Sequence, residues 1–378
     1  MAHQLPIPKE QLFVWAFIPY RVTEQGLIGE FYDNPSYRQE LANVFIELEV
    51  QWKWQPITLE NMSRVVQDVA ASKRNYVPVV LNYCDGFDEV DGYPGTTVVE
   101  LLENQNVVFT GSDSKVFRMC DNKIRMKQAF IKAGVPTAAY HVIVDVSNIQ
   151  GTCRELGTPL IVKPAIASAS SGISLKSVVE SDDQIIKQVQ WLLEGQHSSR
   201  FSLNNIFVER FVSGREFTVF LIGSVKQANF IKIYPPVERV FHSRLPEMQR
   251  FLAHEFYWVE SQSAPSPEPF CRYQLVEGDL RERLSELAKQ AYCAVGGNGY
   301  ARVDIRMDNR SGELFVLEVN NNCGISSKPL STFDDNDLGA TSVGTILHLA
   351  GISFAELMSE ILVEALAKHS LPDVCHVS

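Results

Sequence analysis

The spacing of apolar residues along the chain predicts strands that alternate with helices. Short runs rich in Val, Ile, Leu and Phe predict strands at 77–81, 107–110, 160–163, 206–209, 216–222, 301–307 and 314–319. Apolar residues at helical spacing predict helices that begin at Asn122, after Ser181 and after Ser353. We expect Asp121 to cap the first helix and Gly134 to end it. Strands interleaved with helices indicate an α/β or α+β fold.

Two segments add to this pattern. Strand 77–81 ends in the polar turn Asn82-Tyr83-Cys84-Asp85-Gly86, which is typical of the carboxyl edge of a parallel sheet. We therefore place a first α/β domain at residues 1–112. Residues 234–273 have no sustained period and contain three prolines within 265–269, so we expect a long loop of the kind that forms lids.

Composition narrows the class of protein. The 378 residues include 34 Lys and Arg against 45 Asp and Glu, and the net charge of −11 argues against a partner that is nucleic acid or an anionic membrane. The start of the chain has no basic segment followed by an apolar one, so we expect no signal peptide and a cytoplasmic location. The 7 cysteines are scattered without CxxC spacing, which favours free thiols over disulfides or a zinc site.

The strongest chemical signal lies in the last two predicted strands, which form a hairpin. Polar residues alternate with apolar ones on both strands, and a turn centred on Ser311 places Asp304 opposite Glu318 and Arg302 opposite Asn320. Two carboxylates and an amide oxygen on one face form an all-oxygen set that suits Mg²⁺. The arginine beside them suits a phosphate or a developing oxyanion.

The alternative interpretation of this hairpin is a salt-bridge ladder on a solvated face. The opposite face of the second strand, with Phe315, Leu317 and Val319, is apolar. The polar face continues into 320–324, Asn-Asn-Asn-Cys-Gly, which is a poor continuation for a purely structural strand. We therefore favour the magnesium site.

A second element supplies positive charge. Lys163 ends a predicted strand and precedes the loop 165–172, whose small residues, hydroxyls and glycine let backbone N–H groups approach phosphate oxygens. No GxxxxGK[ST] sequence is present, so the loop is not a P-loop. Lys123 lies near a helix start, where a lysine is usually a solvated surface charge.

The order of these elements resembles the ATP-grasp superfamily, and most closely its D-alanine–D-alanine ligase branch. The resemblance extends over about 82–366 and rests on short stretches in the same order: 109–112, 121–123 with 134–136, 159–164, 170–172, 208–211 with 214–218, 301–304 and 318–324. It implies an ATP-grasp fold, in which a Rossmann-like N-terminal α/β domain precedes two α+β domains that clasp ATP. These two would be a lid domain at 113–213 and a catalytic domain at 214–378.

The resemblance also implies a role for individual residues. The ATP-binding residues would be Lys123 and Lys163 at the phosphates, Ser170, Ser171 and Gly172 in the loop over the γ-phosphate, Glu209, Phe211 and Val212 at the adenine, and Glu216 at the ribose. The metal ligands would be Asp304, Glu318 and Asn320, holding two Mg²⁺ with Glu318 between them and with Mn²⁺ able to substitute. The catalytic groups would be Arg302, the backbone N–H of Gly324 and Lys163, and the substrate would contact Asn322, Lys328 and Pro329.

The reaction that the resemblance implies joins a small-molecule carboxylate to an amine. The carboxylate attacks the γ-phosphorus of ATP, and the amine then displaces phosphate from the acyl phosphate. Phosphoryl transfer needs charge neutralisation and positioning rather than a protein nucleophile, which agrees with this set of residues. The resemblance also suggests a homodimer through the first domain.

The sequence departs from the family where substrates bind. The family's glutamate for the first ammonium group has no counterpart near 19–23, and its Ser-Leu pair for the second carboxylate is here Pro329-Leu330, with Lys328 as the candidate replacement. Ala169 occupies the place of a loop hydroxyl, and only Arg250 and His254 are candidates for the family's lid lysine. We therefore expect substrates other than two D-alanines: one amino acid joined to another, or to a natural-product carboxylate.

Two other functions stay open from the sequence. An ATP-binding regulator without turnover would release no ADP, whereas a ligase given its substrates would. A kinase-like protein would release a phosphorylated metabolite instead of free phosphate.

Overall fold

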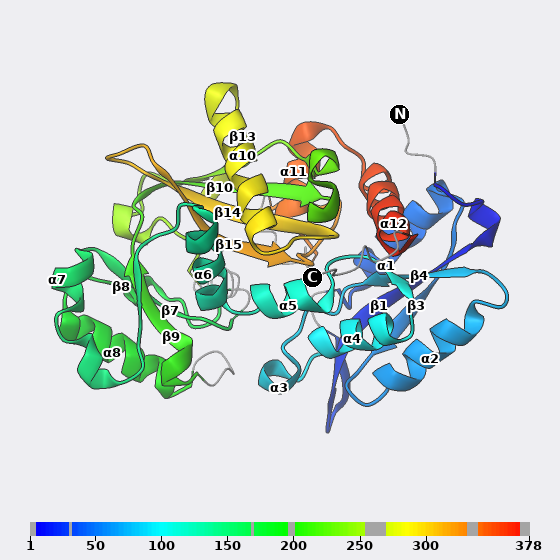
Figure 1. Cartoon of the computed structure of the whole chain (residues 1–378), viewed down its shortest axis with the longest axis horizontal. Helices are drawn as coiled ribbons and strands as arrows, with labels where there is room; N and C mark the ends of the chain where they lie inside the picture. Colours follow the sequence, from blue (N-terminus) through cyan, green and yellow to red (C-terminus); the bar gives the residue numbers. More distant parts are fainter. Residues whose placement is uncertain are drawn as a thin grey trace, which may run out of the picture.

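In the part of the chain that the structure describes, three β-sheets follow one another, and helices cover each of them (Figure 1). The structure is a computed structural model, and it describes residues 5–29, 32–167, 170–195, 201–253, 270–330 and 339–370. In Figure 1 the first sheet lies at the right, the second at the lower left, and the third above the second. The predicted mixture of α/β and α+β parts is confirmed.

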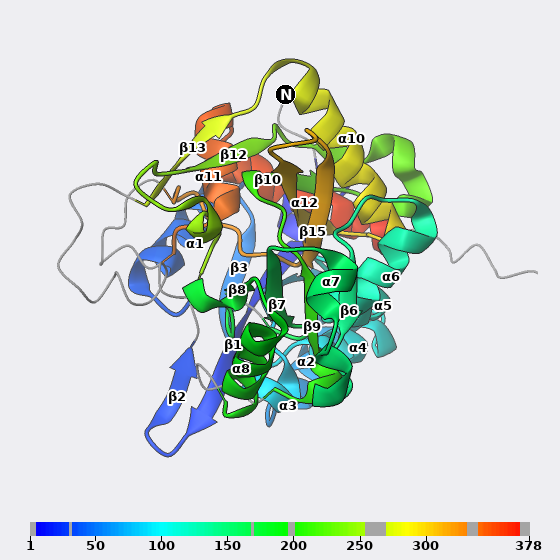
Figure 2. The same cartoon turned by 90° about the vertical axis from the view of Figure 1, so that its left-hand side faces the viewer.

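The first sheet is parallel and has helices on both faces. Its strands run in the order β3-β1-β4-β5, and a short β2 pairs antiparallel with the end of β1 to form a hairpin that extends beyond the sheet (Figure 2). The elements are β1 (Leu12–Thr23), β2 (Gly26–Gly29), α1 (Pro35–Glu47), β3 (Gln51–Ile57), α2 (Met62–Ser72), β4 (Val77–Asn82), α3 (Asp88–Asp91), α4 (Thr96–Asn104) and β5 (Val108–Phe109). Alternate β1 side chains enter two separate cores, with Val14 in one and Trp15 in the other. Such two-sided burial is typical of a parallel sheet and agrees with the predicted Rossmann-like domain.

The second sheet is small and antiparallel, with strand order β6-β9-β7-β8. Its elements are β6 (Tyr140–Val142), α7 (Thr152–Leu156), β7 (Leu160–Pro164), β8 (Val178–Val179), α8 (Asp182–Leu193) and β9 (Ile206–Arg210). The apolar face of α8 covers one side of the sheet, where Ile185 and Val189 share a core with Leu160 and Val162. Ser181 caps α8 as predicted, because its side chain accepts from the backbone N–H of Gln184.

The third sheet is antiparallel in the order β13-β12-β10-β14-β15, with β11 added to β10. Its strands are β10 (Gly214–Ile222), β11 (Lys232–Ile233), β12 (Val237–Phe241), β13 (Cys271–Leu275), β14 (Tyr300–Asp308) and β15 (Leu314–Asn321). Helices α5 (Ser114–Cys120), α6 (Lys123–Ala133) and α10 (Gly278–Ala294) share a core with this sheet. The prediction of one long loop over 234–273 is wrong in part, because β12 pairs with β10 and β13 within the sheet. Residues 254–269 lie outside the described residues.

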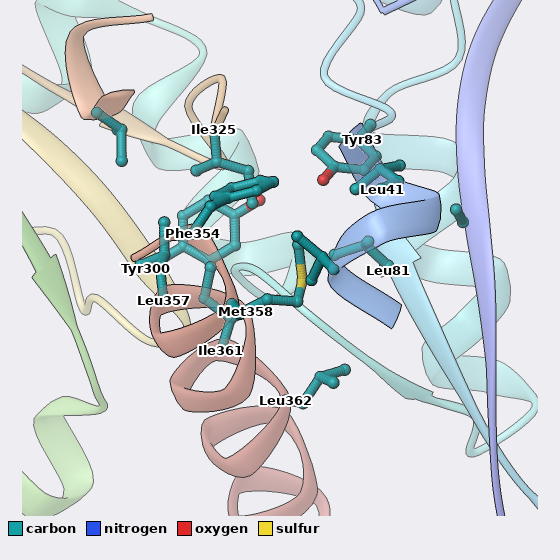
Figure 3. Close-up of a cluster of buried hydrophobic side chains, with 14 of the residues drawn as sticks. Leu41, Leu81, Tyr83, Tyr300, Ile325, Phe354, Leu357, Met358, Ile361 and Leu362 are labelled. Atoms are coloured by element: carbon teal, nitrogen blue, oxygen red, sulfur yellow. The ribbon is translucent and has the colours of Figure 1, made fainter. Parts of the chain in front are cut away.

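Of the last two helices that the structure describes, the first packs on the third sheet and the second returns the chain to the first sheet. They are α11 (Ser342–Ala350) and α12 (Phe354–Ser370), and α12 packs between the first and third sheets, where Phe354 and Met358 share a core with Leu41, Tyr83 and Tyr300 (Figure 3). Within the described ranges, no single helix is long and apolar enough to cross a membrane. Only α11 and α12 taken together meet that test, and they are bent by 115°.

The predicted domain ranges each contain one complete sheet. However, α5 and α6, from the range 113–213, pack on the third sheet, and α12 packs on the first. The boundaries at 112 and 213 therefore stay predictions. A local prediction about the start of α6 is wrong: Asn122 is the capping residue, because its side chain accepts from the N–H groups of Ile124 and Arg125, while Asp121 ends α5.

Candidate active site

The ribbon of β14 and β15 has the predicted register over its polar half. Asp304 pairs with Glu318 and Arg302 pairs with Asn320, so these four side chains share one face of the sheet. A β-bulge follows between Asp304 and the next residue. It shifts the register by one, as a bulge inserts one unpaired residue into a strand.

The bulge corrects the predicted apolar face of β15. The residues of this strand that enter the core are Leu314, Val316 and Val319, whereas Phe315 and Leu317 are only half-buried. The prediction assumed strict alternation along this strand, and it therefore placed Phe315 and Leu317 on the wrong face. The pairs of Asp304 with Glu318 and of Arg302 with Asn320 precede the shift in register along β14, so their predicted pairing is unaffected.

Asp304 is bonded to two other polar residues of the ribbon. Its two carboxylate oxygens accept from the Arg302 guanidinium at 3.1 and 2.9 Å, and Oδ2 also accepts from the Asn320 amide at 2.9 Å. Burial alone would raise the pKa of Asp304, but the charge and hydrogen bonds of Arg302, helped by Arg239 and Thr218, outweigh it and lower this pKa below its ordinary value. Asp304 is therefore a carboxylate, with the charge that a cation ligand requires.

Glu318 connects the ribbon to α6. Its Oε2 lies 3.2 Å from Nζ of Lys123, which also donates to the backbone oxygen of Ala167 at 2.9 Å. The backbone N–H of Lys123 donates to Ala165 at 2.9 Å, so the helix start is fixed to the loop that follows β7. Lys123 is thus not a solvated surface charge, because it lies between the ribbon and the predicted phosphate loop.

Lys163 lies beside a buried carboxylate on the neighbouring strand. Its Nζ is 2.7 Å from Oε1 of Glu209, and Nζ of Lys127 is 2.5 Å from Oε2 of the same side chain. Burial acts to raise the pKa of Glu209, but Lys127 and Lys163 outweigh it and lower this pKa to about 2. Lys127 was not among the residues predicted from the sequence, although it follows Lys123 by four residues and so lies on the same face of the helix.

The predicted adenine and ribose residues lie where β9 leads into β10. Phe211 and Val212 are buried, and the N–H of Phe211 donates to the Pro159 carbonyl at 2.9 Å, which leaves the backbone of Val212 as the candidate for adenine. Both oxygens of Glu216 are occupied, one by Arg239 and the other by Arg306 at 3.4 Å. Binding of ribose by Glu216 would therefore require an arginine to move.

The predicted phosphate loop is attached to the segment that precedes residues 254–269. Ser170 has a positive φ of 58°, and its hydroxyl donates to the Leu252 carbonyl at 3.0 Å. Ser171 and Gly172 follow, and a Cβ at Gly172 would lie 3.0 Å from Pro164 and two other side chains, so the loop packs closely on β7.

Arg250, one of the two candidates for the lid lysine, has its guanidinium bonded to nearby backbone carbonyls. The Arg250 guanidinium donates to the carbonyls of Leu245 at 2.9 Å and Ser243 at 3.1 Å. Ala169 and His254 lie outside the described residues.

The end of the ribbon meets the carboxyl edge of the first sheet. Asn322 has a φ of 51°, and its amide donates to the Asn82 carbonyl at 3.1 Å in a buried position. A Cβ placed at Gly324 would lie 3.2 Å from the Tyr32 hydroxyl, so only a small residue leaves space here. The predicted oxyanion glycine thus lies at the contact between the first and third sheets.

The predicted acceptor residues lie further along the chain. Pro329 forms an isolated bridge with Thr341. Lys328 lines a cavity of about 490 Å³ with α1 and the start of α12, and none of the four polar residues of the ribbon lines it. The structure therefore brings Lys123, Glu318, Asp304 and Arg302 together, and it brings Lys163 to Glu209.

The donor set of the ribbon fits magnesium better than a softer metal. Two carboxylates and an amide supply oxygen ligands, and both carboxylates have protein cations as partners where a metal ion would supply positive charge. Among the described residues, no group of three or more His, Cys, Asp or Glu side chains could hold a metal. An ion here would therefore take its other ligands from water or phosphate, as Mg²⁺ commonly does.

Solved structures with the same architecture show the fold. The D-alanine–D-alanine ligase of Bacillus anthracis, complexed with ATP, has a TM-score of 0.61 at 18% identity, covering 95% of this chain and 98% of that one. A second structure of the same ligase has a TM-score of 0.64 at 19% identity, with the same coverage. The chain therefore has the ATP-grasp fold that the sequence predicted.

Sequence comparisons define the family. The chain is 29% identical over 272 residues to the D-alanine–D-alanine ligase of Idiomarina loihiensis, covering 71% of this chain and 74% of that protein. It is 29% identical over 276 residues to the same enzyme of Marinobacter nauticus, covering 72% and 71%. The family model described as D-ala D-ala ligase C-terminus matches residues 130–363, and the chain belongs to this family. The predicted enzyme class, an ATP-dependent carbon–nitrogen ligase, agrees with it.

One expectation is not borne out by these comparisons. The departures near 19–23 and at Pro329 suggested substrates other than two D-alanines, but the relatives above carry the name of D-alanine–D-alanine ligases. A changed clamp residue alone does not determine a substrate, because binding can use other groups of the same pocket. The expected exclusion of D-alanine is therefore withdrawn.

Proposed function

We propose that this protein is an ATP- and Mg²⁺-dependent ligase that joins the carboxylate of one amino acid to the amine of a second substrate. A carboxylate oxygen attacks the γ-phosphorus, and the bond between this phosphorus and the oxygen of ADP breaks. The amine nitrogen then attacks the acyl carbon, phosphate leaves, and the nitrogen loses a proton to solvent. No step needs a protein nucleophile, because the protein accelerates the reaction by positioning the reactants and neutralising charge.

The observation that carries the proposal is the contact between Lys123 and Glu318. It joins the predicted phosphate side of the site to the predicted metal side at 3.2 Å, although the two residues are far apart in sequence. Asp304 and its partner Arg302 lie on the same face of the ribbon. Alternating lysine, carboxylate and arginine groups of this kind match the charges of a magnesium nucleotide.

Each group has a distinct role in this proposal. Lys123 and Lys163 hold the phosphates, and Arg302 with the N–H of Gly324 stabilises the oxyanion that forms at the acyl carbon. Asp304, Glu318 and Asn320 would hold two Mg²⁺, or Mn²⁺ in their place. The metal, when bound, neutralises charge on the transferring phosphoryl group. The roles of the loop 170–172 and of Glu209, Phe211, Val212 and Glu216 follow the family resemblance.

For the substrates, we propose only their chemical class, an amino-acid carboxylate and an amine. D-alanine belongs in both positions of the first substrate screen, because the relatives named above are D-alanine–D-alanine ligases. Asn322, Lys328 and Pro329 stay proposed substrate contacts. A homodimer is proposed by analogy, and a cytoplasmic location is proposed because the reaction consumes ATP.

The test is release of ADP and phosphate with pairs of amino acids, with the products identified by mass. We expect equal amounts of ADP, free phosphate and an amide product, and no turnover without Mg²⁺. Asp304→Asn and Glu318→Gln should each lower turnover by about 10³-fold, since each removes a negative ligand of the metal ion that neutralises the phosphoryl group. Glu313→Gln, at an exposed position in the turn of the same ribbon, is the matched control and should keep full turnover.

Three outcomes would contradict the proposal or its metal ligands. Nucleotide binding with no ADP from any substrate pair would favour the ATP-binding regulator. ADP with a stable phosphorylated product would favour the kinase-like alternative. Full turnover in Glu318→Gln would show that the metal ligands lie elsewhere.

A further inference from the structure

Lys127 is a buried charge to which the reaction above gives no task. Its side chain is 1% exposed, and it lies on α6, one turn after Lys123. Its Nζ lies 2.5 Å from Oε2 of Glu209 and donates to the Thr137 hydroxyl at 2.8 Å and to the Ala138 carbonyl at 3.1 Å. A lysine is rarely placed so deeply without a specific partner, because removing an ammonium group from water is costly.

The partners of Lys127 connect two of the three sheets. Glu209 belongs to β9 of the second sheet. The Thr137 hydroxyl donates to the Val316 carbonyl at 3.0 Å, and the Val316 N–H donates to the Pro136 carbonyl at 2.9 Å, so the other end of the network is β15 of the third sheet. Val316 lies at the bulge, two residues before Glu318. Lys127 therefore lies between the strand of the metal ribbon and the carboxylate that holds Lys163.

The two lysines on Glu209 differ in exposure. Lys163 is 14% exposed at the predicted phosphate position, whereas Lys127 is enclosed. If the proposed function holds, a nucleotide phosphate competes with Glu209 for Lys163. A buried carboxylate left with no cation is strongly unfavourable, so a second, fixed cation is needed for Lys163 to change partner.

We propose that Lys127 is a positioning residue that keeps Glu209 ionised and in place, so that Lys163 can move from Glu209 to the nucleotide phosphate. This inference rests on the proposed function, because it takes Lys163 as a phosphate ligand. Lys127 itself does not touch the nucleotide in this scheme. It acts through Glu209, with Thr137 fixing its distance from β15.

Other titratable groups around Glu209 do not replace Lys127. Tyr140 of β6 is the register partner of Glu209, and its ring lies 5.4 Å from Nζ of Lys127. Burial raises the pKa of Tyr140, so it stays neutral. The charge of Arg306 on β14 also acts on Glu209, but its Nη1 is paired with Glu216. Lys127 and Lys163 are thus the two cations in contact with Glu209 among the described residues.

The variant that tests this is Lys127→Met, compared with wild type in binding of Mg²⁺ and the nonhydrolysable nucleotide AMP-PNP by calorimetry from pH 6 to 8.5. The full chain is used, and heats in two buffers of different ionisation enthalpy give the protons taken up. In wild type Glu209 stays ionised throughout. In the variant, movement of Lys163 to phosphate leaves Glu209 without a cation, so it takes up a proton. We expect affinity to fall at least tenfold at pH 8 and to improve by up to tenfold per pH unit on acidification, relative to wild type.

The matched control is Lys132→Met, which removes a lysine from an exposed position on the same helix. It should bind the nucleotide as wild type does, with no additional proton uptake. Lys127→Gln, which keeps a hydrogen-bond donor without a charge, replaces Lys127→Met if the latter does not fold. It should show the same pH slope.

The outcomes separate this inference from the proposed function. If Lys127→Met is folded and binds with the wild-type proton count, or is weaker by the same factor at every pH, Lys127 is a packing residue and the inference is wrong. If wild type itself does not bind the nucleotide, the proposed function is wrong, and the inference that rests on it is wrong as well. A pH slope in the variant alone supports the positioning role.

Discussion

Two buried carboxylates on consecutive strands are each placed between two cations, but the cations differ. Glu209 on β9 lies between Lys127 and Lys163, and Glu216 on β10 lies between Arg239 and Arg306. Arg239 and Arg306 are the register partners of Glu216 on the two neighbouring strands, so this trio is a ladder within one sheet. The lysines reach Glu209 from a helix and from a diagonal position on β7.

The difference indicates which carboxylate can change partner. Each arginine has further bonds: Arg306 donates to the carbonyls of Gly214 at 3.0 Å and Arg250 at 2.9 Å, and Nε of Arg239 donates to the Tyr273 hydroxyl at 3.2 Å. A guanidinium fixed at several points is part of the scaffold. Lys163 is a single ammonium on a flexible chain, at the edge of the buried region. The cations of Glu216 are therefore fixed within the sheet, whereas Lys163 is the cation of Glu209 that is able to change partner.

The largest expected effect comes from removing an arginine from the Glu216 cluster. Arg306→Met should lower the free energy of unfolding by about 3–5 kcal/mol, because it leaves a buried carboxylate with one cation and two partly buried carbonyls without this donor. Lys163→Met is the matched change at Glu209 and should cost less than half as much, since Lys163 is the more exposed cation. Urea unfolding followed by tryptophan fluorescence measures both. Equal losses would contradict the distinction between a fixed and an exchangeable cluster.

A smaller effect is expected from acid. The pKa of Glu209 falls from its ordinary 4.5 to about 2 in the folded chain, because Lys127 and Lys163 outweigh its burial. A carboxylate with a lowered pKa adds stability that is complete above 4.5 and is lost as the pH falls toward 2. The difference in unfolding free energy between wild type and Glu209→Gln should therefore shrink by roughly 2 kcal/mol from pH 5 to pH 3.

The control for this measurement is Glu313→Gln, since Glu313 is exposed in the turn of the ribbon. The difference in unfolding free energy between Glu313→Gln and wild type should stay constant over the same pH range. If the Glu209→Gln difference also stays constant, the two lysines do not hold Glu209 ionised in the folded protein.

The polar face of the metal ribbon could be predicted from sequence because strand alternation and a short turn fix a local register. The bulge next to Asp304 could not be predicted from sequence. One extra residue in β15 shifts the register without changing which types of residue the strand contains. For this reason Phe315 and Leu317 were assigned to the wrong face. The strand β12 was missed because prolines at 235 and 236 precede it and its five residues are too few for a clear period.

The ion clusters are harder to predict, because their members are distant in sequence. Lys127 and Glu209 are 82 positions apart, and only the spacing of four from Lys123 marks Lys127 as facing the same side of α6. Glu216 was predicted from the resemblance alone, which does not reveal its two arginines. Composition cannot distinguish a lysine that holds a buried carboxylate from one on the surface, so the pairing appears only in the folded chain.

The smallest effect should come from the hydroxyl that links the Glu209 cluster to the ribbon. Thr137→Val removes an acceptor from Lys127 and a donor from the Val316 carbonyl, and we expect a loss of about 1–2 kcal/mol in unfolding free energy. Thr137→Ser keeps the hydroxyl and removes one methyl group, so it should lose clearly less. Equal losses in the two variants would mean that the methyl group, and not the link between the sheets, stabilises this position. A larger loss in Thr137→Val would support the difference between the two carboxylate clusters. The Glu216 ladder lies within a single sheet, whereas the Glu209 cluster depends on a hydrogen bond to a second sheet.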